Sequence, residues 1–322
     1  MHILVTGGAG FIGSHLVDAL LKADHKVILL DNFDDFYSRS TKLDNIREAL
    51  LSPGATLIEG DIRDRDLLNK IIKDHHINFV VHLAAKAGVR PSIESIGEYY
   101  DVNVNGTLNL LECMKQNGVK DLVFASSSSV YGNNKRVPFS ETDVVDTPIS
   151  PYAATKKSGE LLCHVYSHLY NFNITCLRFF TVYGPRQRPD LAIHKFTRLI
   201  EENKPIPFFG DGSTARDYTF ASDIVQGILQ AIKHIGGYRI YNLGESKTIT
   251  LAKLVELLGK LTNTEVTINR LPNQDGDVQQ TFADISKAKA EIGYDPKIDM
   301  ETGLSEFLKW YNRNNAKSIS SN

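Results

Sequence analysis

The sequence predicts an α/β fold in which helices cover both faces of a parallel β-sheet. Short aliphatic or β-branched runs alternate with stretches of helical length, and this alternation is typical of β-α-β units. The run Phe79-Val80-Val81 is apolar without interruption, which indicates a strand buried on both faces. A glycine-rich loop follows the first apolar run. Together these features favour a doubly wound parallel sheet of the Rossmann type.

Six runs are predicted as strands of this sheet: Ile3 to Thr6, Lys26 to Leu30, Thr56 to Glu59, Phe79 to Leu83, Leu122 to Ala125 and Ile174 to Arg178. After them, prolines and glycines become frequent between helices predicted at Ala221 to Ile235, Thr250 to Thr262 and Thr302 to Asn312. We expect a Rossmann domain over residues 1–180 and a smaller mixed α/β region over 181–315 that binds substrate. Because strands of the second region can cross back, we expect no clean separation. Residues 316–322 are predicted to be a frayed tail.

Composition excludes several classes of partner. Lys and Arg total 36 and Asp and Glu total 38, for a net charge of -2, so we expect neither nucleic acid nor a membrane surface as partner. The cysteines Cys113, Cys163 and Cys176 are few, odd in number and widely spaced, which favours reduced thiols in a cytoplasmic protein. No charged and apolar leader precedes the first strand and no apolar run has the length of a membrane span, so we expect neither a signal peptide nor a span.

The opening loop has the composition of a dinucleotide site. It reads Val5-Thr6-Gly7-Gly8-Ala9-Gly10-Phe11-Ile12-Gly13 and satisfies both Gly-x-x-Gly-x-x-Gly and, from Gly8, Gly-x-Gly-x-x-Gly. Its glycines allow a tight turn and close approach of the backbone to a pyrophosphate, and the helix that follows points free N–H groups at the phosphates. Asp31 ends the next strand. Its carboxylate suits ribose hydroxyls and would repel a 2′-phosphate, so NAD is favoured over NADP.

Two further strands end in segments that can meet the cofactor. Asp61-Ile62 follows the third strand, where Asp61 is either an adenine-side contact or the N-cap of the next helix. Leu83-Ala84-Ala85-Lys86 follows the fourth strand, and its small residues permit close approach. Lys86 is either a cofactor contact or solvated surface. The charged stretch Asp34 to Arg47 is expected to be a solvated loop and helix.

A candidate catalytic group begins a helix behind Pro151. In Tyr152-Ala153-Ala154-Thr155-Lys156 the i, i+4 spacing places Tyr152 and Lys156 on one helix face. A nearby ammonium stabilises a phenolate and therefore lowers the pKa of the tyrosine. Ser126 to Ser129 end the fifth strand, where a hydroxyl can share a hydrogen bond with the reacting oxygen of a substrate. The alternative for these serines is a polar strand exit with caps.

These segments resemble the extended short-chain dehydrogenase/reductase family, particularly the nucleotide-sugar epimerases of carbohydrate metabolism. The match covers nearly the whole chain and includes Gly7 to Gly13, Leu83 to Arg90, Ser126 to Gly132, Tyr152 to Lys156, Arg178 to Gly184 and Gly210 to Asp223. Within that family the chain is most similar to UDP-glucuronate 4-epimerases. The segment most specific to that group is Phe179 to Asp190.

The resemblance implies a mechanism. Tyr152, as phenolate, removes the proton of the sugar 4-hydroxyl while C4 passes a hydride to NAD, and Ser129 supports that oxygen. The transient 4-keto sugar rotates and takes hydride and proton back on its other face. NAD is thereby regenerated in each turnover, which implies that it stays bound.

The resemblance also implies the residues of each site. The cofactor contacts would be Gly7, Gly10, Phe11, Ile12, Gly13, Asp31, Asn32, Asp61, Ile62, Leu83, Ala84, Ala85, Lys86, Asn103, Ser127, Tyr152, Lys156 and Tyr183. The UDP-sugar contacts would be Arg90, Ser128, Ser129, Thr181, Arg188, Lys195, Phe196, Phe208, Phe209, Arg216 and Asp277. Thr181 and Arg188 match the positions that hold the glucuronate carboxylate, and arginine suits a bidentate clasp. The alternatives for Arg188 are a loop salt bridge or a phosphate contact. No metal is expected.

Other reactions remain as alternatives. No carboxylate stands beside Ser129, which disfavours 4,6-dehydration. A 4-epimerase of neutral UDP-sugars (UDP-glucose or UDP-N-acetylglucosamine) and a UDP-glucuronate decarboxylase stay open. A non-catalytic NAD-binding regulator is the alternative from another class, and the intact set of Tyr152, Lys156 and Ser129 argues against it.

The resemblance further implies a homodimer. The stretches Ile96 to Gln116 and Tyr152 to Tyr170 correspond to helices that pair across a two-fold axis into a four-helix bundle. His164 and His168 share i, i+4 spacing on the second stretch. They lack a third ligand, and we interpret them as helix surface or interface.

Overall fold

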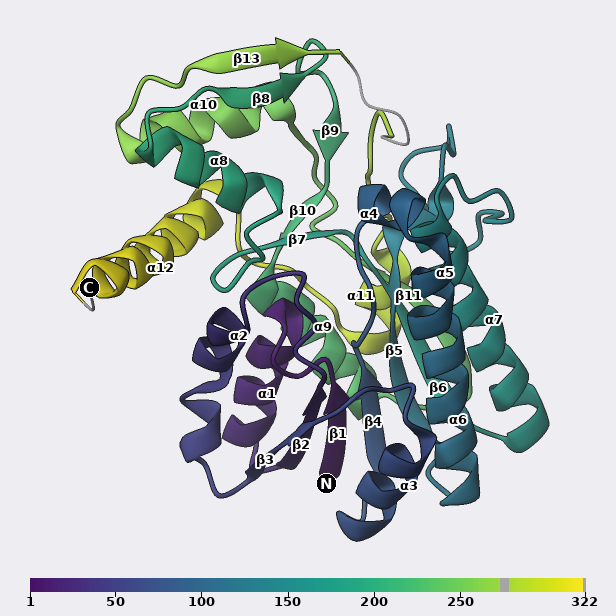
Figure 1. Cartoon of the computed structure of the whole chain (residues 1–322). Coiled ribbons are helices and arrows are strands. Elements are labelled where there is room, and N and C mark those ends of the chain that lie inside the picture. Colours follow the sequence, from purple (N-terminus) through teal and green to yellow (C-terminus); the bar gives the residue numbers. More distant parts are fainter. Residues whose placement is uncertain (273–277, 321–322) are drawn as a thin grey trace.

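The structure of the protein is a computed structural model that describes residues 1–272 and 278–320. Its centre is a seven-stranded sheet with the order β11-β6-β5-β4-β1-β2-β3, and each strand is parallel to its neighbours (Figure 1). The strands are β1 (His2–Thr6), β2 (Lys26–Asp31), β3 (Ala55–Glu59), β4 (Phe79–His82), β5 (Asp121–Ser127), β6 (Asn173–Phe179) and β11 (Tyr238–Leu243). The doubly wound Rossmann-type sheet predicted from the sequence is confirmed.

Successive strand residues enter opposite cores because side chains alternate across a sheet. In β1, Ile3 and Val5 belong to one core and Leu4 to the other, and all three are fully buried. The first core lies under α1 (Phe11–Lys22), α2 (Arg39–Ile46), η1 (Ala49–Leu51), α9 (Ala221–Lys233) and α11 (Ser286–Ile292). The second lies under α3 (Arg65–Asp74), the π-helical turn η2 (Asp101–Asn105), α6 (Gly106–Gln116) and α7 (Pro151–Tyr170). The short helix α5 (Ile96–Tyr100) precedes η2 and contacts α7.

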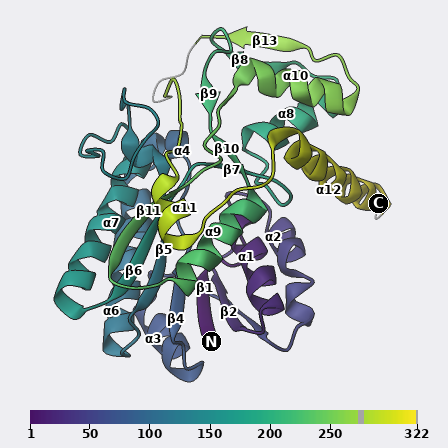
Figure 2. The ribbon, with the colours of Figure 1, turned by 180° about the vertical axis from the view of Figure 1, so that it is seen from behind.

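The smaller region lies beyond the carboxyl ends of the strands (Figures 1 and 2). Its elements are β7 (Thr181–Tyr183), α8 (Ala192–Glu201), β8 (Ile206–Phe209), β9 (Ala215–Arg216), β10 (Tyr218–Phe220), β12 (Ile249–Thr250), α10 (Leu251–Thr262), β13 (Ile268–Leu271) and α12 (Met300–Ser320). Two short elements of the first region, α4 (Val89–Glu94) and η3 (Ser128–Tyr131), face it. The chain crosses between the two regions, since α9, β11 and α11 pack with the large sheet (Figure 2).

Helix α12 differs from the prediction at its end. The sequence predicted a frayed tail over 316–322, whereas the helix continues to Ser320. No glycine or proline occurs between Arg313 and Ser320, so polar composition alone did not mark a helix end. Across the described residues, no helix combines the length and the apolar character needed to cross a bilayer.

A buried ion pair ties α7 to the sheet. Glu160 of α7 accepts hydrogen bonds from Arg178 of β6 at 2.8 and 2.9 Å, and both side chains are 1% exposed. Ser126 donates to the same carboxylate at 2.6 Å, and the remaining Arg178 nitrogen, Nη1, donates to the hydroxyl of Tyr131 at 2.9 Å. That hydroxyl donates in turn to Asn242 of β11 at 2.7 Å. The network holds α7 over the carboxyl ends of β5, β6 and β11.

We predict that Glu160→Gln lowers the free energy of unfolding by about 3 kcal/mol, because the Arg178 guanidinium is left buried without its counter-charge. Urea denaturation followed by circular dichroism measures this. The control is Glu306→Gln, which removes an exposed pair with Lys309 and should change the free energy of unfolding by less than about 0.5 kcal/mol. Equal effects of the two substitutions would contradict the role given to the buried pair.

Candidate active site

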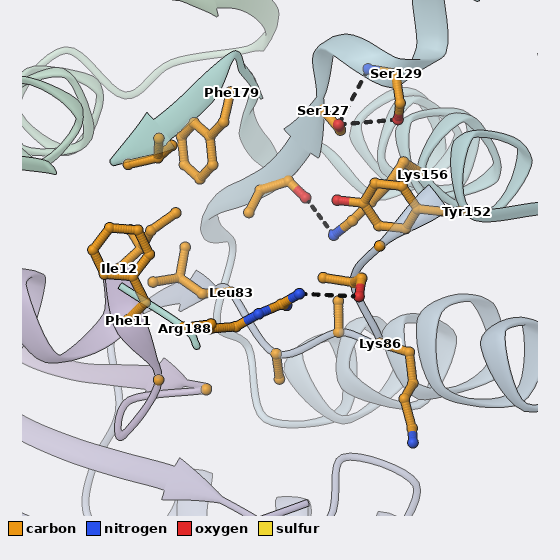
Figure 3. A pocket seen from close by; sticks show the side chains of 18 of the residues that line it. Phe11, Ile12, Leu83, Lys86, Ser127, Ser129, Tyr152, Lys156, Phe179 and Arg188 are labelled. Carbon is orange, nitrogen blue, oxygen red and sulfur yellow. Dashed lines mark hydrogen bonds between the residues drawn. The ribbon is translucent and has the colours of Figure 1, made fainter. Parts of the chain in front are cut away.

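A cavity of about 520 Å³ lies at the carboxyl edge of the sheet, between the two regions. It brings together the glycine loop after β1, the segments after β2 to β6, and the start of α7 (Figure 3). Of the predicted cofactor residues, it is lined by Gly7, Gly10, Phe11, Ile12, Gly13, Asp31, Asn32, Asp61, Ile62, Leu83, Ala84, Ala85, Lys86, Ser127, Tyr152 and Lys156. Of the predicted substrate residues, it is lined by Ser128, Ser129, Thr181, Arg188 and Arg216.

The glycine loop fits a pyrophosphate. Gly7 has φ +71°, and a Cβ there would lie 2.9 Å from the backbone nitrogen of Ala84. A Cβ on Gly13 would lie 2.1 Å from the carbonyl oxygen of Gly7, so only hydrogen fits at this position. Gly10, the N-cap of α1, makes no side-chain cap. The free N–H groups of the first turn of α1 therefore remain for an anionic ligand in the cavity.

Asp31 both lines the cavity and fixes the loop. Its Oδ2 accepts the N–H of Ala9 at 3.1 Å, and its Oδ1 accepts the N–H of Phe33 at 2.9 Å. Burial raises the pKa of Asp31, while the charge of Lys42 and the two N–H groups act in the opposite sense. A carboxylate in this position can accept from ribose hydroxyls and opposes a 2′-phosphate, so the cavity fits NAD.

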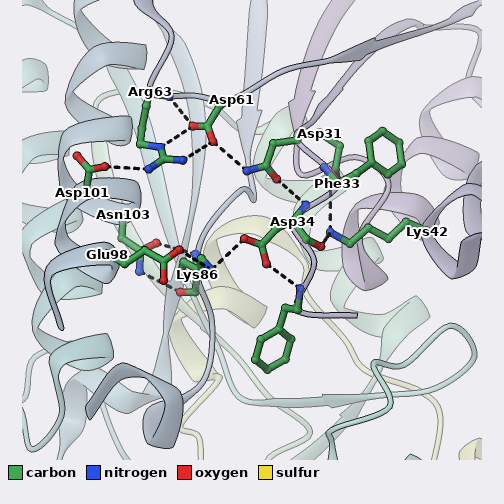
Figure 4. A network of polar contacts seen from close by, with 12 residues as sticks. Asp31, Phe33, Asp34, Lys42, Asp61, Arg63, Lys86, Glu98, Asp101 and Asn103 are labelled. Carbon is green, nitrogen blue, oxygen red and sulfur yellow. Dashed lines mark hydrogen bonds and ion pairs between the residues drawn. The ribbon is translucent and has the colours of Figure 1, made fainter. Parts of the chain in front are cut away.

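Two polar bridges cross the edge of the cavity next to Asp31 (Figure 4). Lys86 pairs with Asp34, after β2, at 2.9 Å and with Glu98 of α5 at 2.8 Å. Lys86 is therefore no freely solvated lysine. The stretch from Asp34, expected to be solvated, supplies Asp34, Phe36, Tyr37 and Lys42 to the cavity lining. That expectation was wrong for Lys42, which is buried, whereas Phe36 lines the cavity and is still 42% exposed.

The second bridge runs through Arg63. Its guanidinium pairs with Asp61 at 2.8 Å and with Asp101 of η2 at 2.9 Å, and Asn32 donates to Asp61 at 2.9 Å. These contacts lower the pKa of Asp61 to about 2, chiefly through the hydrogen bonds from Arg63. The N-cap alternative for Asp61 was wrong, since Asp64 caps α3 by accepting the N–H of Leu67.

Two predicted cofactor residues do not line the cavity. Asn103 forms two hydrogen bonds with the backbone of Lys86. Its Oδ1 accepts the N–H at 2.8 Å, and its Nδ2 donates to the carbonyl at 3.0 Å. It therefore holds the Lys86 segment in place. Tyr183 is fully buried in the core of the smaller region, where its hydroxyl donates to the carbonyl of Asp299 at 3.3 Å. Its ring fills the space that Gly303 of α12 leaves open.

Helix α7 presents Tyr152 and Lys156 to the cavity. Ser150 caps the helix by accepting the N–H of Ala153, and Pro151 supplies its first residue. The ammonium of Lys156 donates to the carbonyl of Ala125 at 2.7 Å and lies 6.0 Å from the centre of the Tyr152 ring. Burial lowers the pKa of Lys156 to about 8.

The groups that favour the Tyr152 phenolate differ from the prediction. Burial raises the pKa of Tyr152, and a hydrogen bond from Ser127 and the charge of Arg188 act in the opposite sense. Lys156, which the sequence analysis expected to lower this pKa, points to Ala125 instead. Ser129 donates its hydroxyl to Ser127 Oγ at 3.0 Å, and Figure 3 shows the two serines at the same end of the cavity as Tyr152.

Arg188 stands opposite these groups on the loop after β7. Its Nε and Nη2 donate to Asp190 at 3.0 and 2.7 Å, so Arg188 forms the loop salt bridge that was one predicted alternative. Arg188 also lines the cavity. The loop is anchored on α1. His15 donates to the carbonyl of Pro185 at 2.8 Å, and Arg186 pairs with Asp18 at 2.8 Å.

Most of the predicted uridine-side residues lie outside the cavity lining. Phe196 and Phe208 are buried in the core of the smaller region, and Lys195 is exposed. The Arg90 guanidinium lies 5.4 Å from the centre of the Phe209 ring, so these two residues join the two regions at the rim. Asp277 lies outside the described residues. The family resemblance placed these residues near the nucleotide. In β8, Phe208 and Phe209 are neighbours on a strand and therefore point to opposite faces, so Phe208 enters the core while Phe209 contacts Arg90.

Comparison with known proteins gives concordant findings. Residues 3–244 match the model of the NAD dependent epimerase/dehydratase family. The chain is 44% identical over 314 residues to a UDP-glucuronate 4-epimerase of Thermodesulfobacterium geofontis, with 97% of each chain covered. It is 45% identical to UDP-glucuronate 4-epimerase 2 of Arabidopsis thaliana over 96% of this chain and 75% of that one. The crystal structure of a UDP-glucuronic acid 4-epimerase from Bacillus cereus, in complex with UDP-glucuronic acid and NAD, superposes with a TM-score of 0.92 at 38% identity, covering 98% of this chain and all of that one.

We predict that Lys156→Met raises the free energy of unfolding at pH 7 by roughly 1 kcal/mol, because burial opposes the ammonium more than the lost bond to Ala125 stabilises it. Between pH 8 and about 10.5 the unfolded chain binds a proton at Lys156 that the folded protein has released. The stability of the unsubstituted protein therefore rises over this range, and the advantage of the variant shrinks.

Urea denaturation at pH 7 and pH 10 measures this difference. The control is Lys70→Met on the exposed face of α3, which should change stability by less than about 0.5 kcal/mol at either pH. A Lys156→Met protein that is less stable at pH 7 and recovers at pH 10 would contradict the prediction.

Proposed function

The chain belongs to the NAD dependent epimerase/dehydratase family, and we propose that it is an isomerase that inverts C4 of UDP-glucuronate to give UDP-galacturonate. One observation carries the proposal. Tyr152 and Arg188 line the same cavity, and the charge of Arg188 reaches the Tyr152 hydroxyl. A base for the 4-hydroxyl and a cation for the carboxylate on the adjacent sugar carbon therefore stand together.

Bound NAD would accept a hydride from C4 of the sugar and return it to the opposite face. Tyr152 takes the proton of the 4-hydroxyl and gives it back, since it lies at the centre of the cavity lining on α7. The Ser127 hydroxyl, which itself accepts from Ser129, stabilises the phenolate. Lys156 is held by its hydrogen bond to the carbonyl of Ala125. Its ammonium binds the ribose on the nicotinamide side. Ser129 is the second donor to the sugar oxygen at C4.

The substrate carboxylate determines which reaction follows. Loss of hydride from C4 gives a 4-keto uronate, which is a β-keto acid and prone to lose CO2. We assign Arg188 and Thr181 to the carboxylate, since both line the cavity near Tyr152. A guanidinium holds a carboxylate in one plane, which restricts the rotation that decarboxylation needs. Arg216 lines the same cavity and is assigned to the diphosphate.

The deciding experiment needs only the purified protein and UDP-glucuronate, without added NAD. We expect UDP-galacturonate to form, because NAD is regenerated in each turnover and remains bound. Chromatography resolves the epimers, and mass spectrometry detects any decarboxylated product by the loss of CO2. If the product has lost CO2, the protein is a decarboxylase; if neither product forms with NAD added, the proposed function is wrong.

Two variants separate the remaining alternatives. Arg188→Ala should lower kcat/KM for UDP-glucuronate by about two orders of magnitude, since it leaves a buried carboxylate unpaired. It should lower any turnover of UDP-glucose much less, because a neutral sugar loses only the effect of the Arg188 charge on Tyr152. An equal loss for both sugars would indicate a 4-epimerase of neutral UDP-sugars. Tyr152→Phe should abolish turnover while NAD stays bound. If Tyr152→Phe turns over sugar at nearly the rate of the unsubstituted protein, Tyr152 is not the base, and the alternative of an NAD-binding regulator is favoured.

We also propose a homodimer formed through a four-helix bundle. On α7, Leu161, Val165 and Leu169 recur at i, i+4 spacing and are 56%, 45% and 58% exposed. On the neighbouring helical stretch 96–116, Ile96, Tyr100 and Leu108 are also exposed. A continuous apolar stripe over two packed helices favours burial against a second copy. The unpaired thiols of the three cysteines favour a cytoplasmic location.

We predict that Val165→Glu combined with Leu169→Glu halves the apparent mass in sedimentation velocity, because two charges would be buried at the apolar interface. The control is Leu51→Glu, which changes a leucine that is 75% exposed on another face and should leave the mass unchanged. If both proteins sediment as the unsubstituted chain does, the stripe is not the interface.

A further inference from the structure

We propose that Asp190 and Phe36 are positioning residues that aim Arg188 at the substrate carboxylate. They thereby determine what fraction of the 4-keto uronate keeps its carboxylate instead of losing CO2. The inference rests on the proposed function, since it names what fixes the residue that distinguishes a uronate from a neutral sugar. Asp190 ends the segment Phe179 to Asp190 but had no role assigned to it, and no motif included Phe36. The two residues come from loops that lie far apart in the chain.

The hydrogen bonds of Arg188 leave one edge of its guanidinium for a ligand. Nε and Nη2 donate to the two oxygens of Asp190 at 3.0 and 2.7 Å. The second hydrogen of Nη2 faces the carbonyl of Ala87 at 3.5 Å, which is a long contact. Among the described residues, none accepts a hydrogen bond from Nη1. The Nη1–Nη2 edge is therefore the one that can clasp a second carboxylate.

Phe36 fixes the plane of the same group. The Arg188 carbon Cζ lies 4.9 Å from the centre of the Phe36 ring, at cation–π distance. The hydrogen bonds to Asp190 and the contact with the Phe36 ring together restrict the positions that the guanidinium can take. Figure 3 shows that the Arg188 side chain extends across the cavity below Tyr152. The charge of Arg188 also acts to lower the pKa of Tyr152, so the guanidinium lies within electrostatic reach of the reacting end of the cavity.

Asp190 could instead compete with the substrate for Arg188, and the structure argues against this. The five N–H groups of arginine serve two carboxylates when these occupy different edges. The Asp190 side chain is 37% exposed and that of Arg188 18% exposed, so Asp190 approaches from the rim and leaves the inner edge open. The two roles predict opposite results: without its charge, a positioning residue weakens uronate binding and a competitor strengthens it.

The side reaction that Arg188 must suppress has a defined balance. In the 4-keto uronate the C5–C6 bond can break, with its electron pair passing into a C4–C5 enolate and C6 leaving as CO2. Protonation at C5 from water then gives a 4-keto pentose. The C5–C6 bond breaks most readily when it stands perpendicular to the plane of the ketone. A guanidinium fixed on the carboxylate holds C6 away from that geometry, and a loose one does not.

The first test is Asp190→Asn, which keeps the shape of the side chain and removes the charge that binds Nε and Nη2. Calorimetry gives the ratio of the Kd of UDP-glucose to the Kd of UDP-glucuronate, and we expect this ratio to fall about tenfold, as for the loss of a charge-assisted pair. We expect the CO2-losing share of turnovers, measured by mass, to rise by a similar factor.

The matched control is Glu59→Gln. Glu59 holds Arg39 through two hydrogen bonds of 2.6 and 2.7 Å, and Arg39 lies 4.3 Å from the centre of the Phe33 ring. It therefore repeats the chemistry of the Asp190–Arg188–Phe36 set outside the cavity lining. We expect no change in either ratio.

A second pair of variants tests the ring and remains informative if Asp190→Asn fails to fold. Phe36→Leu keeps apolar volume and removes the aromatic face, whereas Phe36→Tyr keeps the face. We expect Phe36→Leu to lower the binding ratio about threefold and to raise the CO2-losing share about threefold. We expect Phe36→Tyr to leave both quantities as they are in the unsubstituted protein.

The outcomes separate the inference from the function. If the unsubstituted protein epimerises UDP-glucuronate while Asp190→Asn and Phe36→Leu keep its ratios, or if Asp190→Asn binds uronate more tightly, the inference alone is overturned. If the unsubstituted protein does not turn over UDP-glucuronate, the proposed function and the inference both fail.

Discussion

The ion pair between Glu160 and Arg178 is the interaction on which the site depends. It joins α7, which carries Tyr152 and Lys156, to β6, and it extends to β5 through Ser126 and to β11 through Tyr131 and Asn242. Two buried charges cost solvation energy, and they are tolerated because each nitrogen of the Arg178 guanidinium donates a hydrogen bond and Glu160 accepts from both Arg178 and Ser126. The benefit is geometric. A purely apolar contact would let the helix slide, whereas these directional bonds permit one position of α7 over the strand ends.

Helix α7 places Tyr152 where burial raises its pKa and so disfavours the phenolate. Two other groups act to lower that pKa. The Ser127 hydroxyl comes from the end of β5, and the positive charge of Arg188 comes from the loop after β7. Lys156 is held on a backbone carbonyl. Arg188 therefore has two roles in one cavity. Its charge favours the phenolate, and in the proposed function its guanidinium also binds the carboxylate of a uronate. Substrate recognition and the readiness of the base are consequently linked through a single side chain.

The loop after β2 links the two ends of the cavity. Asp31 at its start fixes the glycine loop through Ala9, and Asp34 pairs with Lys86. A few residues further on, Phe36 lies against Arg188. The loop thus touches both the proposed site of the adenosine ribose and the proposed site of the sugar carboxylate. Its ion pairs with Lys86 also reach α5, whose neighbouring surface carries part of the apolar stripe. Cofactor, substrate and proposed dimer surface therefore share one set of contacts.

The sequence by itself determined the parallel sheet, the glycine loop with Asp31, and the helix that carries Tyr152 and Lys156. These features follow from local patterns: alternation of apolar runs, the absence of a side chain at Gly7 and Gly13, and i, i+4 spacing. The sequence did not determine which side chains face the cavity. Asn103 contacts the backbone and Tyr183 the core. Phe36 and Arg63, which no motif included, line the cavity, and Asp190, which ends a recognised segment but had no assigned role, pairs with Arg188. It also assigned the stabilisation of the phenolate to Lys156, which tertiary contacts direct to Ala125. The reason is physical: spacing along the chain fixes neighbours within one helix or strand, whereas charge and burial at an atom are set by segments that meet only when the chain has folded.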